Sequence, residues 1–103
     1  MNKYGLYGKF KTQKGKRDEL ISILLQAAKL VSTAKGCYHY IIYKDTNDAD
    51  SVFVGEIWDT KEDHDNSLKM EGCMELISKA MPLIDGKPEG AALEVIGGKG
   101  IDY

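Results

Sequence analysis

The chain has 103 residues, of which 43% are hydrophobic and 29% are charged. This length is typical of one domain with a modest core, so we expect residues 1–103 to form a single domain. Fourteen Lys and Arg against sixteen Asp and Glu give a formal net charge of −2. That balance provides no basic field for nucleic acid, and no apolar run approaches the length of a membrane span.

The two cysteines, Cys37 and Cys73, lie far apart and form no C-x-x-C pair. This spacing does not match a zinc site or a redox pair, so we expect no metal. Two isolated thiols in an acidic chain, with no signal-like apolar core at the N-terminus, are typical of a reducing compartment. We therefore expect a cytoplasmic protein.

In the first half of the chain, the apolar pattern changes from strand to helix. Residues 4–11 alternate, with Tyr4, Leu6 and Phe10 on one face, which indicates a strand. Residues 17–32 place apolar side chains at i, i+4, i+7, i+8 and i+11 from Leu20, which predicts a helix. Gly36 stands where a helix C-cap is common.

The remaining elements follow from turn and cap residues. Two β-rich runs, 37–44 and 51–59, flank the turn DTNDAD, and Thr60 precedes an acidic first turn, which predicts a helix over 61–70. A second amphipathic segment covers 73–84, and a last strand covers 91–97. The order β-α-β-β-α-α-β predicts an α+β fold, the ferredoxin-like split βαβ sandwich, with helices on one face of a four-stranded sheet.

The central strands carry apolar or aromatic residues on both faces. In 37–44, Tyr38, Tyr40 and Ile42 alternate with Cys37, His39 and Ile41. Helices cover only one face, and a sheet face that meets water is expected to be polar. We therefore predict a homodimer in which two sheets pack face to face as a dimeric α/β barrel. The alternative is a monomer with a few exposed aromatic residues.

The end of the third predicted strand is the candidate ligand site. If Trp58 faces the helices, the helix from residue 61 folds over it, and His64, Ser67 and Leu68 share one side of that helix by i, i+3, i+4 spacing. Mostly apolar walls with a few polar groups are typical of a ligand pocket. The alternative makes Trp58 a core anchor and His64 a solvent-facing residue. For His64 by itself this alternative is favoured, because nothing in the spacing shows that the side chain points inward. His39, in mid-strand, is more typical of a structural histidine than of a base.

Three further patterns resemble sites by residue type only. DTNDAD together with Glu56 resembles a calcium-binding loop by residue type, but the sixth position of that loop would be Asp50, where a glycine is required. GGKG at residues 97–100 has no following helix to bind phosphate. His64, Asp65 and Ser67 lie on one short helix, where they do not assemble as a catalytic triad.

The segment EIWDTKEDHDNSL, together with QKGKRDEL, GCYHY and AMPLIDGKPEG, resembles the antibiotic biosynthesis monooxygenase (ABM) domain family, which includes quinol monooxygenases. The resemblance covers residues 4–98. It implies a dimeric ferredoxin-like barrel that oxygenates a small electron-rich aromatic, of quinol or anthrone type, without metal, flavin or haem cofactor. It also implies that Trp58 walls the ring, that His64 is the base or hydrogen-bond donor, and that Tyr40, Ser67 and Leu68 contact the substrate.

Two departures from the family pattern bear on this expectation. Many members carry a histidine nine residues after the tryptophan, where this chain has Ser67, and its imidazole stands one helical turn earlier at His64. The first strand has no asparagine of the kind used by haem-degrading relatives, which disfavours haem degradation. A noncatalytic dimeric α/β barrel that binds a small apolar ligand is the alternative function, because this fold hosts both kinds of protein.

Overall fold

The computed structural model describes residues 2–101. Its elements, in chain order, are β1 (Lys3–Lys11), α1 (Arg17–Val31), β2 (Cys37–Lys44), β3 (Ser51–Trp58), α2 (Lys61–Ser67), α3 (Cys73–Ala80), a 3-10 turn η1 (Met81–Leu83) and β4 (Glu89–Val95). The strands form one antiparallel sheet in the order β2-β3-β1-β4. This is the strand order of the ferredoxin-like fold, and the predicted α+β class is confirmed.

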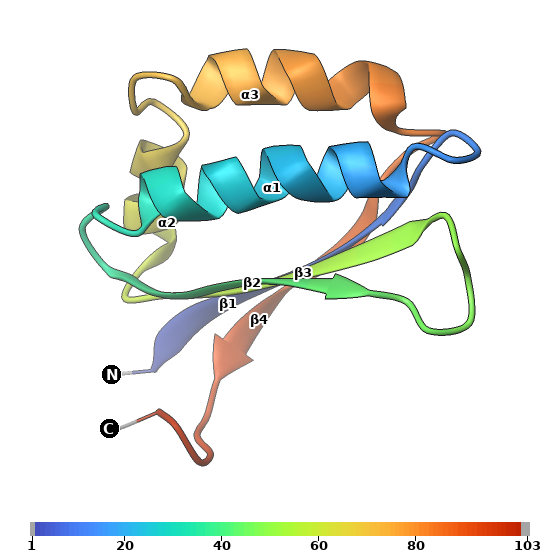
Figure 1. Cartoon of the computed structure of the whole chain (residues 1–103). Helices are drawn as coiled ribbons and strands as arrows, with labels where there is room; N and C mark the ends of the chain where they lie inside the picture. Colours follow the sequence, from blue (N-terminus) through green and yellow to red (C-terminus); the bar gives the residue numbers. More distant parts are fainter. Residues whose placement is uncertain (1, 102–103) are drawn as a thin grey trace.

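The helices cover one face of the sheet (Figure 1). α1 and α3 lie side by side over that face, and α2 lies at the end where β3 finishes. The core between the layers centres on Leu20, Ile23, Val52 and Leu83, all buried. Each such side chain contributes roughly 1.5–3 kcal/mol by leaving water. Within residues 2–101, none of the helices combines the length and the apolar character that a membrane crossing requires.

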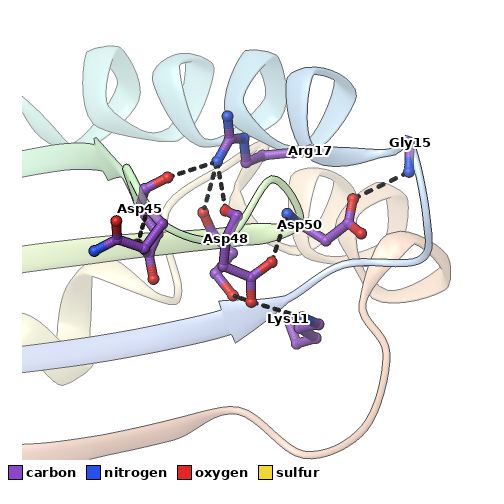
Figure 2. Close-up of polar contacts among 8 residues, drawn as sticks. Lys11, Gly15, Arg17, Asp45, Asp48 and Asp50 are labelled. Atoms are coloured by element: carbon purple, nitrogen blue, oxygen red, sulfur yellow. Dashed lines mark hydrogen bonds and ion pairs between the residues drawn. The ribbon is translucent and has the colours of Figure 1, made fainter.

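The β2–β3 hairpin is held to the start of α1 by Arg17 (Figure 2). Its guanidinium donates from Nη1 to the carbonyl oxygens of Asp45 and Asp48, at 3.0 and 2.8 Å. The Asp48 carboxylate accepts from Lys11 Nζ at 2.6 Å and from Ser51 Oγ at 2.8 Å, and the Lys11 ammonium is the largest cause of the lowered Asp48 pKa. The Asp48 carboxylate therefore binds donors of the chain itself, as expected for a structural turn.

Several predicted boundaries are wrong by a few residues. α1 ends at Val31 and α2 at Ser67, so both are shorter than predicted. The predicted segment 73–84 is helical only to Ala80, because Pro82 has no backbone N–H to continue the ladder, and a 3-10 turn replaces the last part. The last strand lies two residues earlier than predicted, at Glu89–Val95.

Gly36 does not cap α1, so that prediction is wrong. The C-cap is Ser32, and Gly36, with φ 81°, lies at the entry to β2. A Cβ at this position would collide with the side chain of Asp63 on α2. The glycine therefore allows α2 to approach the start of β2 closely.

A β-bulge interrupts the alternation predicted for β2. Cys37 pairs with Trp58 and His39 with Ile57, so Tyr38 has no partner in β3. Tyr38 is 51% exposed, whereas Tyr40 still lies on the helix side. The prediction that Tyr38 shares a face with Tyr40 is wrong, because the extra residue of a bulge shifts the period of two.

Candidate functional site

Glu56 is the centre of the site, and sequence reasoning did not single it out. Antiparallel pairing places Glu56 opposite Tyr40 on one side and Leu6 on the other, on the face covered by helices. Trp58, two residues further along β3, is fully buried, and its indole Nε1 donates to Glu56 Oε1 at 2.9 Å. The period of two was the available signal, since it puts a carboxylate between two buried residues, Val54 and Trp58.

α2 brings His64 over this carboxylate. The helix starts at Lys61 because the Thr60 side chain caps it, accepting from Asp63 N at 3.0 Å. The His64 ring and the Trp58 indole pack in a T-shaped arrangement, with centroids 5.8 Å apart and planes at 80°. Its side chain is only 14% exposed, so the solvent-facing alternative for His64 is wrong.

The carboxyl and the imidazole are close without a direct hydrogen bond. His64 Nε2 lies 3.9 Å from Glu56 Oε1, beyond hydrogen-bond range. Burial raises the pKa of Glu56, and the Trp58 N–H and the nearby imidazole oppose that rise only in part. A buried carboxyl that takes up a proton more readily, next to an imidazole, is typical of a proton-handling site.

A cavity of about 110 Å³ adjoins these two groups. Its apolar walls come mainly from α1 and α3, and its polar groups are Tyr40, Glu56, His64, Ser67 and Cys73. Four of the five residues predicted for the site therefore meet at one cavity: Tyr40, His64, Ser67 and Leu68. Trp58 is not among the lining residues; it lies behind Glu56 and supports it.

The individual side chains differ in what they can offer a ligand. Burial, and then the charge of Glu56, raises the pKa of Tyr40, so its phenol stays protonated and able to donate. The Ser67 hydroxyl donates to the His64 carbonyl at 2.6 Å and is engaged with its own helix. Leu68 is 43% exposed and lies at the rim. Because the Ser67 hydroxyl donates to a backbone carbonyl and not to a side-chain base, its geometry agrees with the sequence argument against a triad.

Other hollows on the described surface differ in character. One, of about 400 Å³, lies over β1 and β4. It shares Tyr40 and Glu56 with the 110 Å³ cavity. Another, of about 460 Å³, lies beside α2 and is lined by charged and polar residues that include Lys35, Asp59 and Asp63. Both are more open than the 110 Å³ cavity, which alone of the three includes His64.

The fold and the cavity define a ferredoxin-like α+β protein with a buried aromatic and acidic site. Residues 4–77 match the family model of the antibiotic biosynthesis monooxygenases. A candidate antibiotic biosynthesis monooxygenase from Chloroflexus aurantiacus J-10-fl is 36% identical, with 97% of this chain and 99% of that chain covered and a TM-score of 0.87. The chain belongs to the antibiotic biosynthesis monooxygenase family, and the predicted resemblance is confirmed.

Two more distant structures share the fold. SnoaB from Streptomyces nogalater, a cofactor-independent oxygenase solved as a mutant, is 12% identical, with 98% and 100% of the two chains covered and a TM-score of 0.83. A candidate antibiotic biosynthesis monooxygenase from Caulobacter crescentus CB15 is 18% identical, with 93% and 92% covered and a TM-score of 0.85. No curated protein matches this sequence.

Proposed function

We propose that the protein is a cofactor-independent monooxygenase that oxidises a small electron-rich aromatic, of quinol or anthrone type, with O₂. The observation that carries the proposal is the cavity, in which Tyr40, Glu56 and His64 meet apolar walls from α1 and α3. Membership of a family that contains monooxygenases, and the fold shared with the oxygenase SnoaB, support it. Residues 1–103 would act as one domain.

The proposed reaction needs acid–base groups and exclusion of water. His64 Nε2 takes a proton from the bound aromatic, and the resulting anion gives an electron to O₂. For an anthrone, one oxygen atom becomes the new carbonyl, and the other leaves as water with the two hydrogens of the ring methylene. The Tyr40 phenol, whose raised pKa keeps it protonated, donates a hydrogen bond to the developing oxyanion. No cofactor is required, because the deprotonated ring is itself the electron donor.

The size of the cavity bears on the substrate. A volume of about 110 Å³ is near the roughly 150 Å³ of an apolar cavity known to hold benzene. One aromatic ring is therefore enclosed, and a second ring would extend past Leu68 and Ile77, which line the cavity and are 43% and 36% exposed. Ser67 and Leu68 would contact the ring edge, and Trp58 would act through Glu56.

The test is oxygen uptake with a panel of monocyclic quinols and anthrones. We expect His64→Ala to lower the rate by about 10²-fold or more, because a positioned general base contributes that much. Trp58→Phe should also lower the rate of oxygen uptake, since Glu56 loses the hydrogen bond from the indole N–H. Asn66→Ala is the matched control: it is exposed on the same helix and does not line the cavity. Equal rates in all four proteins would remove these residues from the mechanism. Ligand binding without oxygen uptake by any substrate would favour the noncatalytic barrel.

We also propose that the uncovered sheet face pairs with a second copy of the chain, giving a homodimeric α/β barrel. Tyr7, Ile41, Tyr43 and Leu93 are between 43% and 51% exposed there, around a hollow of about 520 Å³. A water-facing antiparallel sheet normally carries polar residues on that face. The same face of a second copy would remove these side chains from water.

Sedimentation velocity tests the dimer. Ile41→Asp should give a monomer, because two acidic groups would be buried in a symmetric interface. Met74→Asp is the matched control, since Met74 is 63% exposed on α3, away from the sheet. A wild-type monomer at high concentration would refute the pairing. The expected cytoplasmic location and the expected absence of a nucleic-acid partner stay predictions. Cys37 and Cys73 are both free thiols.

A further inference from the structure

Asp65 connects the imidazole of His64 to Lys61 on the surface of α2. Its Oδ1 lies 2.9 Å from His64 Nδ1, and its Oδ2 lies 2.6 Å from Lys61 Nζ. The Asp65 side chain is 47% exposed, whereas that of His64 is 14% exposed. Both carboxylate oxygens are therefore engaged, one toward the site and one toward a surface ammonium.

The charge state of Asp65 determines which nitrogen of His64 carries the proton. The Lys61 hydrogen bond, and then that from His64, lower the pKa of Asp65, so it is a carboxylate at neutral pH. An ionised carboxylate only accepts hydrogen bonds, so Nδ1 must carry the hydrogen. In the neutral ring, Nε2 then has a free lone pair, and Nε2 is the nitrogen that lies toward Glu56, at 3.9 Å.

We infer that Asp65 is a positioning residue for His64: it holds the Nδ1–H tautomer, so that the Nε2 lone pair is presented to the cavity, and it stabilises the imidazolium formed when Nε2 takes a proton. The tautomer follows from the contacts and the charge of Asp65, whereas its use in oxygenation rests on the proposed function. Asp65 does not line the cavity, so it would act through His64 and not on the ligand. The titratable groups around the imidazole are Tyr4, Tyr40, Glu56 and Cys73 from other elements, and Lys61 and Asp65 on its own helix.

The protonated nitrogen can be observed directly by ¹⁵N NMR of the imidazole at a pH where His64 is neutral. The chain has two histidines, so His39→Ala assigns the signals. We expect the wild-type His64 to show a protonated Nδ1 and a bare Nε2. Asp65→Ala should raise the population of the Nε2–H form, because nothing then accepts from Nδ1. Asp65→Asn should also raise the population of the Nε2–H form, because its amide oxygen would accept from Lys61 and its amide NH₂ would then donate to Nδ1.

Oxygen uptake provides the second readout. Asp65→Ala should lower kcat by about tenfold or more, with KM changed by less than about twofold, because the wrong tautomer removes the base without altering the walls. Asn66→Ala should change neither quantity.

The two measurements separate the two ideas. A wild-type His64 with Nε2 protonated, or a tautomer that does not respond to Asp65→Ala in a folded variant, would overturn the positioning role whatever the activity. A tautomer that responds as expected in a protein that consumes no oxygen would support the positioning role and refute the proposed function.

Discussion

The hydrogen bond between the indole and Glu56 gives a prediction for Trp58→Phe. Phenylalanine keeps most of the ring but has no N–H, so Glu56 Oε1 loses its donor at 2.9 Å. A hydrogen bond to a charged group contributes roughly 1.5–3 kcal/mol, and the smaller ring adds about 1 kcal/mol for unfilled space at a fully buried position. We expect a loss of about 2.5–4 kcal/mol, which lowers Tm by roughly 10–30 °C in a domain of this size.

The control is the same substitution in a Glu56→Gln background. The glutamine oxygen still accepts from Trp58, but as a neutral group, so the bond contributes only about 0.5–1.5 kcal/mol. The double-mutant cycle should therefore give a coupling free energy of about 1–1.5 kcal/mol, measured at about pH 8, far above the ordinary pKa of a glutamate.

Urea unfolding at one fixed protein concentration is the assay, followed by far-ultraviolet circular dichroism because Trp58 is the only tryptophan. A coupling below about 0.4 kcal/mol is the size seen for independent sites. That result would show that the indole acts by packing alone, and the account of Glu56 as a supported carboxylate would be wrong.

Three other predictions concern stability. Arg17→Ala should cost about 2 kcal/mol in urea unfolding, since the charged hydrogen bonds to three hairpin carbonyls are lost, and Arg17→Lys should recover less than half of it. Burial raises the folded-state pKa of Glu56, so the stability that its protonated form contributes is present at low pH and is lost as pH rises through that pKa. The advantage of Glu56→Gln over wild type in urea unfolding should therefore grow as pH rises above about 4.3, the ordinary pKa of a glutamate. A difference that stays constant with pH would contradict this. Gly36→Ala should lower Tm more than Gly15→Ala. Both glycines have φ near 80°, but only at Gly36 would a Cβ collide with the side chain of Asp63. Equal losses of Tm would mean that backbone strain alone determines the effect.

Local chemistry was enough to predict the elements and their order. Alternation in β1 and β3, the 3.6-residue pattern of α1 and the Thr60 cap each depend on neighbours in the chain, and each is found in the structure. The error at Gly36 arises because a distant segment intervenes. Gly36 has the positive φ expected of a cap, but the reason is the side chain of Asp63 on α2, 27 positions away in the sequence.

The site divides in the same way. By itself, the sequence determined that Trp58 and Glu56 share one face of a strand and that His64 and Ser67 share one side of a short helix, because strand and helix periods are local properties. Only the tertiary structure decided that Glu56, and not Trp58, meets the cavity, and that Asp65 reaches back to the imidazole. Cavities and pKa shifts arise from how separate elements pack and desolvate one another, and no spacing within a single element contains that information.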